Sequence, residues 1–253
     1  MQISIRAEDI FHIGNFAVTN SVLSAFVTLL VLAGAALFLR RRLKMIPGKL
    51  QNILEIMIEG ALGLMDSVLG DRRKSEKYFP VVFTIFLFIL FSNWLGLIPG
   101  VGSLIVNTPT GATPVFRSPS ADLNFTLALA LIAVTFVNVF GIIAVGWKER
   151  LGTFLNFKDP ISFFTGILEL ISEFAKIISF SFRLFGNIFA GEVLLTIMAA
   201  LVPFLVPVPF FFLEIFVGFI QAFIFGMLTL VFIAMATSGG HLEASGAGES
   251  LPG

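Results

Sequence analysis

The chain has 253 residues, of which 57% are hydrophobic and only 13% charged, with 16 Lys and Arg against 16 Asp and Glu. Soluble domains carry about 25% charged residues, so this composition excludes an ordinary soluble domain, and the neutral balance gives no sign of nucleic-acid binding. The chain contains no Cys, which removes disulfides, thiolate metal sites and cysteine catalysis. The two His, His12 and His241, lie near opposite ends of the chain, and no metal site is expected.

Five apolar segments approach or exceed the roughly 20 residues that a helix needs to cross a bilayer. They predict an all-α, polytopic membrane protein that forms a single membrane domain over residues 1–253. The fourth segment is longer than a perpendicular crossing requires, which predicts a tilted or bent helix. Pro203, Pro207 and Pro209 separate it from the fifth, so the last two segments are expected to form a long helical hairpin. The five predicted segments are Ser21–Leu39, Phe79–Ile98, Leu123–Gly146, Ile161–Leu201 and Phe210–Thr237.

The stretches outside these segments are more polar. Residues 1–20 contain Glu8 and Asp9, so we expect an external N-terminal segment followed by a retained first span rather than a cleaved signal peptide. Residues 47–70 are amphipathic at a helical period, which predicts a helix on the cytoplasmic membrane surface; a water-facing helix packed on a partner is the alternative. Residues 99–121 predict an irregular loop, and the Gly- and Ser-rich residues 238–253 predict a mobile tail.

The basic residues of the loops predict the orientation, because cytoplasmic loops carry more Lys and Arg than external loops. With the N-terminus outside, twelve of the 16 Lys and Arg fall in the inside loops, and only Arg6 and Arg117 fall outside. The remaining two, Lys176 and Arg183, lie within the membrane. This topology places the C-terminus in the cytoplasm.

Arg183 is the most informative single residue, because it lies in a stretch that is apolar enough to be embedded in a bilayer. A guanidinium keeps its proton at any accessible pH. Placing one at membrane depth costs between about 2.5 and 17 kcal/mol, depending on the reference state. Such a charge needs polar partners and indicates a functional site.

Further ionisable and amide residues are spaced around Arg183 at helical intervals. Those of the fourth segment, Glu192 excepted, lie within one stripe of about 80° on a helix. Glu192 falls about half a turn from Arg183, and the two polar residues of the fifth segment share one face. The set consists of Glu169, Glu173, Lys176, Arg183, Asn187 and Glu192 in the fourth segment and Glu214 and Gln221 in the fifth.

A polar stripe along membrane helices is what ion passage requires, because carboxylates, amides and water must replace bulk hydration. The alternative is a set of internal ion pairs, such as Glu173–Lys176 or Arg183–Glu192, that only hold helices together. Taken singly, Glu173 could have no role, and Lys176 could extend toward the inner interface. Because the sequence has no phosphate-binding loop, Ser/His/Asp set or metal cluster, the chain alone is predicted to be no enzyme and to bind no cofactor.

At these residues the chain closely resembles subunit a of the F-type ATP synthase, over nearly everything from about Val22 to Ala236. The resemblance rests on Arg183-Leu184-Phe185-Gly186-Asn187 with Ala190-Gly191-Glu192 downstream, on Leu168-Glu169-Leu170 and Lys176 upstream, and on Gln221-Ala222-Phe223. The run Ser92-Asn93-Trp94-Leu95-Gly96-Leu97-Ile98-Pro99-Gly100 resembles the family as well.

The resemblance implies an ion-translocating subunit of the F0 sector that forms two offset half-channels against a ring of c subunits and couples ion flow to ATP synthesis. The implied partners are the c-ring, subunit b of the peripheral stalk, the rest of the complex, membrane lipid and the transported ion, which is H⁺ with Na⁺ as the alternative. A bacterial plasma membrane is expected, with an organelle inner membrane as the alternative. From the residues alone, a self-contained ion transporter or channel and a structural membrane anchor also stay open.

The resemblance also implies a role for each polar residue. Arg183 matches the essential arginine that faces the ring. The outer half-channel is implied to include Glu192, Glu214 and Gln221, with Asn187 beside the arginine, and the inner half-channel Glu169, Glu173 and Lys176. The position of Glu214 varies between His and Glu across the family and often trades with that of Glu192. Both are acidic here, which leaves open which of the two is the main relay.

Overall fold

The computed structural model describes residues 7–13, 16–44, 46–98, 104–108, 111–154, 160–202 and 205–238. Most of these residues are helical, and five helices are long and apolar enough to cross a membrane, which confirms the predicted fold class. The helices are α1 (Asn20–Arg42), α2 (Lys49–Leu69), α3 (Arg72–Leu95), α4 (Leu123–Val145), α5 (Trp147–Phe154), α6 (Pro160–Leu201) and α7 (Pro207–Ser238). The predicted mobile tail, except for Ser238, lies outside the described residues.

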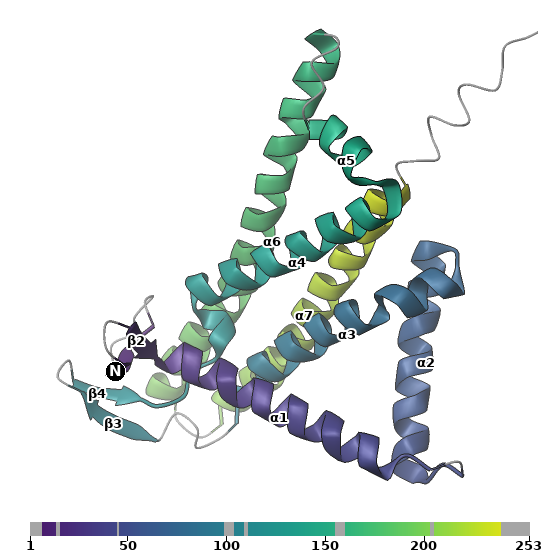
Figure 1. Ribbon diagram of the computed structural model, residues 1–253. Helices are drawn as coiled ribbons and strands as arrows, with labels where there is room; N and C mark the ends of the chain where they lie inside the picture. The colour runs from purple at the N-terminus through teal and green to yellow at the C-terminus, as the bar shows by residue number, and fades with distance from the viewer. Residues whose placement is uncertain are drawn as a thin grey trace, which may run out of the picture.

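The first three helices follow one another along the sides of a triangle, with α2 joining the end of α1 to the start of α3 (Figure 1). Gly70 ends α2 in the left-handed conformation, with φ of 67°, where a side chain would be strained. The Asp71 carboxylate then accepts a hydrogen bond from the Arg73 amide at 2.9 Å, which caps α3. Helix α3 therefore starts at Arg72 rather than at Phe79, and the basic residues expected in that loop lie on its first turns.

Arg72 ties the corner between α2 and α3 together. Its guanidinium donates hydrogen bonds to Asp66 at 2.9 Å and Glu59 at 2.7 Å on α2, and to Glu76 at 3.3 Å on α3. The Arg72 guanidinium thus forms ion pairs with carboxylates on both helices and holds α2 and α3 in their relative orientation.

This corner should weaken at low pH. The Ser75 hydroxyl and the Arg72 guanidinium beside Asp66 lower the pKa of that carboxyl below its ordinary value of 3.8. A lowered folded-state pKa contributes stability above the unfolded pKa, and that stability is lost as the pH falls through the folded value. Hydrogen exchange of residues 66–75, corrected for intrinsic rates, should show stronger protection in wild type than in Asp66→Asn at neutral pH. The two proteins should converge only once the pH has fallen below the folded-state pKa of Asp66, which lies below 3.8; equal protection at neutral pH would refute the contribution.

The last helix lies at the centre of the membrane bundle. Helix α7 packs against α3, α4 and α6, and α4 also packs along α6. The shared core contains the fully buried large side chains Ile89, Leu184 and Phe225. Small residues such as Ala130 and Ala222, both 0% exposed, let the backbones approach closely, as is common between membrane helices.

One end of the bundle carries extended structure that the sequence did not predict. Strands β1 (Asp9–Ile13) and β2 (Phe16–Thr19) form one antiparallel hairpin, and β3 (Ile105–Thr108) and β4 (Gly111–Pro114) form another. A short 3₁₀ helix, η2 (Pro119–Ala121), leads from the second hairpin into α4. The expectation of an irregular loop over 99–121 is therefore wrong for residues 105–108, 111–114 and 119–121. We call this end of the molecule, where the N-terminal hairpin also lies (Figure 1), the hairpin end.

Candidate functional site

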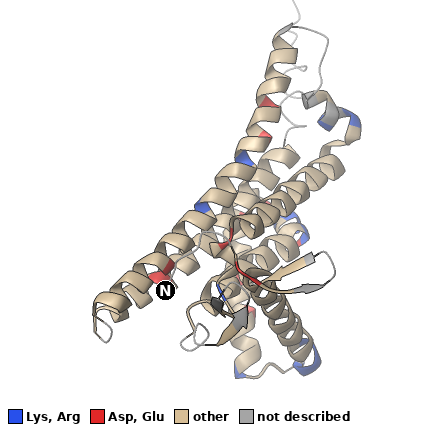
Figure 2. Ribbon diagram, turned by 90° about the vertical axis from the view of Figure 1, so that its left-hand side faces the viewer, with Lys and Arg blue, Asp and Glu red and all other residues tan. Residues whose placement is uncertain are grey.

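Charged residues follow one another along α6, the longest helix, as Figure 2 shows. Near its middle lies Arg183, which is exposed in this chain. Its guanidinium donates a hydrogen bond to Ser179 Oγ at 3.3 Å, one turn earlier, and forms no ion pair within the described residues. The neighbours Ile178 and Phe182 are each 54% exposed, so the cation lies on an open apolar face. The alternative ion pair between Arg183 and Glu192 does not form: the two lie nine residues apart on nearly opposite sides of α6, and Glu192 pairs with Arg117.

Asn187, one turn after Arg183, connects α6 to α7. Its amide donates a hydrogen bond to Gln221 Oε1 at 2.8 Å, and the Gln221 side chain is buried at 3% exposure. The structure thus brings together two predicted site residues from different helices beside the arginine.

Removing one partner of this amide pair should cost more than removing both. Asn187→Leu leaves the buried Gln221 carbonyl without its donor, which should destabilise the subunit by about 1–3 kcal/mol. Thermal dissociation of the chain from its assembled complex should fall to a lower temperature in Asn187→Leu. The double variant Asn187→Leu/Gln221→Leu should recover much of the loss, and a double variant less stable than the single one would count against this hydrogen bond.

Two side chains at the end of α3 fix the position of α7. Asn93 Nδ2 donates to the Gly218 carbonyl at 3.0 Å, and Trp94 Nε1 donates to the Ile215 carbonyl at 3.1 Å. A Cβ at Gly218 would lie 3.3 Å from Asn93 Cβ, so glycine permits this close approach. Because Gly218 lies between Glu214 and Gln221, these contacts also fix the positions of the two polar residues of α7 along the helix bundle.

At the hairpin end, polar groups from three segments meet in what we call the Arg117 cluster, namely Arg117, Glu192 and Glu214. Glu214 of α7 is buried at 7% exposure, and its carboxylate lies against Gly191 of α6, at the place that a Cβ on that glycine would occupy. The next residue, Glu192, is bound instead by Arg117, whose Nε lies 3.1 Å from each of the two carboxylate oxygens. Both predicted acidic residues therefore lie side by side, in different surroundings.

Arg117 is a site residue that the sequence alone indicates only as a cation of an external loop. Its side chain is 7% exposed, and its guanidinium carbon lies 5.9 Å from the centre of the Phe189 ring. The Arg117 amide donates to Ser24 Oγ of α1 at 3.2 Å, and the neighbouring Ser118 hydroxyl donates to the Ser92 carbonyl of α3 at 3.3 Å. The one sign of a special role for Arg117 in the sequence is that it is a basic residue in a loop predicted to be external, where few basic residues are expected.

Toward the other end of α6, a second group forms what we call the Glu173 cluster, namely Asn138, Arg150, Glu173 and Lys176. Glu173 is buried, and Lys176 Nζ lies 2.7 Å from its Oε1, which is the ion pair considered from the sequence. Asn138 of α4 donates to Glu173 Oε2 at 3.1 Å and accepts from Arg150 of α5 at 3.0 Å. The Arg150 guanidinium lies 3.7 Å from Glu173 Oε1.

The sequence predicted neither Asn138 nor Arg150 at this site, because Asn138 depends on how α4 packs along α6, and Arg150 depends on how α5 packs against α4 and α6. Lys176 does not extend freely toward the interface: it is held by Glu173 and lies 5.0 Å from the centre of the Phe232 ring. Glu169, one turn before Glu173, is partly exposed.

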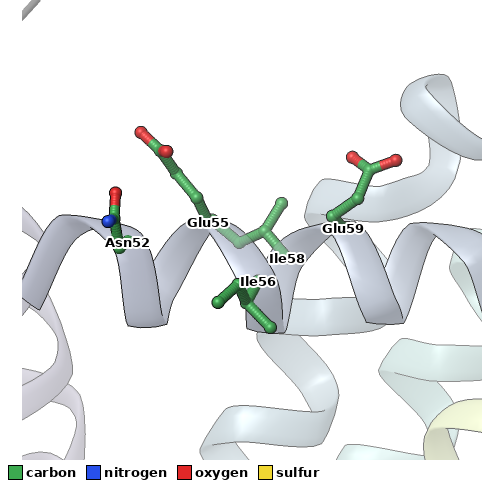
Figure 3. A pocket seen from close by; sticks show the side chains of 5 residues that line it. All are labelled: Asn52, Glu55, Ile56, Ile58 and Glu59. Carbon is green, nitrogen blue, oxygen red and sulfur yellow. The ribbon is translucent and has the colours of Figure 1, made fainter. Parts of the chain in front are cut away.

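A shallow hollow of about 490 Å³ is found on helix α2, away from both clusters in the sequence. Its lining side chains all come from α2, with the Glu55 and Glu59 carboxylates directed outward (Figure 3). Over the described ranges no group of three or more His, Asp or Glu is arranged to hold a metal ion.

The fold and the site define a polytopic helical membrane protein with ionisable groups built into its two longest helices, a class suited to ion translocation. The chain belongs to the ATP synthase A chain family, whose family model matches residues 21–234. Proton transport in ATP synthesis is the function of this family, and the chain serves it as a membrane component of the ATP synthase complex.

Named relatives agree over most of the chain. It is 33% identical to ATP synthase subunit a of Moorella thermoacetica, over 91% of this chain and 96% of the relative. It is 37% identical to ATP synthase subunit a 1 of Syntrophotalea carbinolica, over 87% and 86% of the two chains. It is 38% identical to ATP synthase subunit a of Helicobacter pylori strain P12, over 91% and 92%.

Proposed function

We propose that this chain forms two offset proton half-channels against a ring of c subunits, with Arg183 separating them. The observation that carries the proposal is the exposed guanidinium of Arg183 on an apolar face of α6, without an ion-pair partner among the described residues. A permanent charge on such a surface at membrane depth requires an anionic partner from another chain. A carboxylate on each subunit of a passing ring would meet that need.

The physics of one fixed cation accounts for coupling. A ring carboxylate is neutral while it faces lipid, because an ionised one there is costly. Beside Arg183 the ionised form is favoured, so the carboxylate releases its proton toward the exit. The same cation repels a proton that would pass directly between the half-channels, so ions ride the ring nearly a full turn. Each charge that crosses the membrane potential releases about 2.3 kcal/mol per 100 mV.

The two clusters supply the remaining parts of the path. We assign the Arg117 cluster with Gln221 and Asn187 to the outer half-channel and the Glu173 cluster with Glu169 to the inner one. The positive-inside charge pattern supports this orientation, with the N-terminus outside and the C-terminus in the cytoplasm of a bacterial plasma membrane. In this proposal the chain binds no nucleotide and catalyses no bond cleavage by itself.

Helix α2 is the proposed seat of the peripheral stalk subunit b. Most of its side chains are exposed, among them the apolar Ile53 at 56% and Ile56 at 71% and the acidic Glu55, whereas Glu59 is paired with Arg72. A surface of this kind suits a partner helix that presents both apolar and basic side chains.

Cysteine crosslinking tests both assignments in one preparation, because the chain has no native Cys. The variants are Phe182→Cys on α6 and Ile53→Cys on α2. They are matched because the native Phe182 and Ile53 side chains have similar exposure, 54% and 56%. In the assembled complex the first should crosslink to the ring and the second to the stalk. Crosslinking of the α6 cysteine to the stalk, or of neither cysteine to any partner, would contradict the proposal.

A further inference from the structure

The place where α1 ends and α2 begins carries a dense group of positive charge, which we call the basic corner (residues 40–44 and 46–51). Its exposed basic side chains are Arg40, Arg41, Arg42, Lys44 and Lys49. None of these cations forms an ion pair within the described residues. The sequence has no Asp or Glu between Asp9 and Glu55, so no acidic residue of α1 offsets this charge.

The other corner of the same helices, between α2 and α3, is electrically balanced. There the Arg72 guanidinium binds three carboxylates, and Asp71 caps the helix that carries the further basic residues. The charged residues of this second corner are Glu59, Asp66, Asp71, Arg72, Arg73, Lys74, Glu76 and Lys77. Its cations and carboxylates are equal in number, whereas the basic corner has an excess of cations that favours an anion from outside the chain.

The basic corner lies where α1 leaves the membrane, at the opposite end of α1 from the hairpin end (Figure 1). About 30 Å of helix separates Asn20 from Arg40, which matches the thickness of the hydrocarbon core. The buried residues of α1 end at Thr28, so the half of the helix that leads to the corner is open to lipid. Exposed apolar side chains continue into the corner itself, with Leu43 at 62% and Ile46 at 86%. The cations therefore lie at the depth of lipid headgroups, beside apolar side chains that suit acyl chains.

Hydrogen bonds within the basic corner hold it in shape. The Lys44 amide donates to Gln51 Oε1 at 3.1 Å, and Gln51 Nε2 donates back to the Lys44 carbonyl at 3.1 Å. Gln51 Nε2 also donates to the Glu55 carboxylate at 2.9 Å. The Arg42 guanidinium carbon lies 4.7 Å from the centre of the Phe38 ring. Because these contacts order the corner in advance, a ligand binds it at a smaller cost in entropy.

We propose that the basic corner is a binding site for the headgroups of anionic phospholipids. Guanidinium groups bind phosphate oxygens through paired N–H···O bonds, and a cluster of about four to eight basic residues next to a membrane helix attracts anionic lipid. An acidic protein segment would match the charge, but a phospholipid also matches the exposed Leu43 and Ile46 and the lipid-facing half of α1. A bound lipid fixes the depth of this corner in the membrane. The inference goes beyond the proposed function and does not depend on the half-channels.

Site-specific fluorescence quenching in the whole ATP synthase tests this site. The complex is reconstituted in phosphatidylcholine vesicles with a small fraction of lipid that carries a nitroxide on its acyl chain, either phosphatidylglycerol or phosphatidylcholine. A bimane fluorophore on Leu43→Cys, with the other subunits made cysteine-free, reports which lipid lies beside the corner, because this chain has no native Cys. Phosphatidylglycerol should associate at least about fivefold more strongly than phosphatidylcholine, the contribution of a single basic residue at such a surface. Equal quenching by the two lipids, or quenching by neither because a protein covers the corner, would overturn the inference.

Charge variants in the same labelled complex show whether the preference arises at this corner. Arg41→Gln/Arg42→Gln should bring the association of the two lipids close to equal, and Arg41→Lys/Arg42→Lys, which keeps the charge, should preserve the preference. The matched control Arg73→Gln/Lys74→Gln removes two cations from the balanced corner and should leave the preference unchanged, with the amount of assembled complex measured in each preparation. A preference that survives Arg41→Gln/Arg42→Gln, or that falls equally in the control, would contradict the proposed site.

Discussion

Replacing Arg183 by alanine should abolish both ATP synthesis and ATP-driven proton pumping in a complex that still assembles. The side chain forms one hydrogen bond to Ser179 and no ion pair within the described residues, so its loss leaves the packing of α6 intact. What disappears is the fixed charge that separates the half-channels. We expect both rates to fall at least about 100-fold, comparable to the removal of one preorganised electrostatic group from an active site.

The matched control is Arg73→Ala, which removes an exposed arginine from the first turn of α3. Its synthesis and pumping rates should stay near wild type, with equal amounts of assembled complex in all three preparations. Coupled activity in Arg183→Ala would mean that the charge is structural, and the proposed mechanism would fall although the family assignment would stand.

The substitution Gly191→Ala should impair proton transport through a single added methyl group. The Glu214 carboxylate occupies the place where a Cβ of residue 191 would lie, so the carboxylate must move away. Because the displaced group is the flexible end of a side chain rather than backbone, the subunit should still fold and assemble. We expect a loss of about tenfold or more in proton pumping, since a proton-transferring group works only within hydrogen-bond reach of its partners.

Gly34→Ala on α1 provides the control, because apart from its chain neighbours and the adjacent backbone of its own helix no described atom lies within 4 Å of the position where its Cβ would be. That variant should pump protons at the wild-type rate. If Gly191→Ala and Gly34→Ala proved equally active, the close contact between Glu214 and α6 would have no functional meaning.

The sequence predicted the helical framework well because apolar length is a strong local signal. The first residues of helices were less predictable where a capping side chain decides them. Asp71 caps α3, so the helix begins at Arg72, seven positions before the apolar run that starts at Phe79. The two hairpins at one end were missed, because their strands are short and depend on contacts with each other and with the start of α1. Residues 104–108 and 111–114 contain Thr, Pro and Gly at positions typical of loops.

The residues of the candidate site, too, were predictable only in part. Spacing along one helix was enough to place Glu169, Glu173, Lys176, Arg183 and Asn187 on α6. Partners from distant segments were not accessible to that reasoning: Arg117 reaches Glu192 over 75 positions of sequence, and Asn138 reaches Glu173 over 35. Helical periodicity says nothing about which loop folds onto which helix face. The structure therefore adds counter-ions to a set of residues whose charges were already apparent.

The measurement that tests the central claim most directly is passive proton flux through vesicles stripped of the catalytic head, with the ring locked by a crosslink from Phe182→Cys. With Arg183 present, the locked complex should conduct no protons, because the only route requires the ring to turn. With Arg183→Ala in the same locked complex, protons should leak from one half-channel to the other. Equal flux in the two locked complexes, whether both leak or both stay closed, would contradict the role of Arg183 as the barrier between the half-channels.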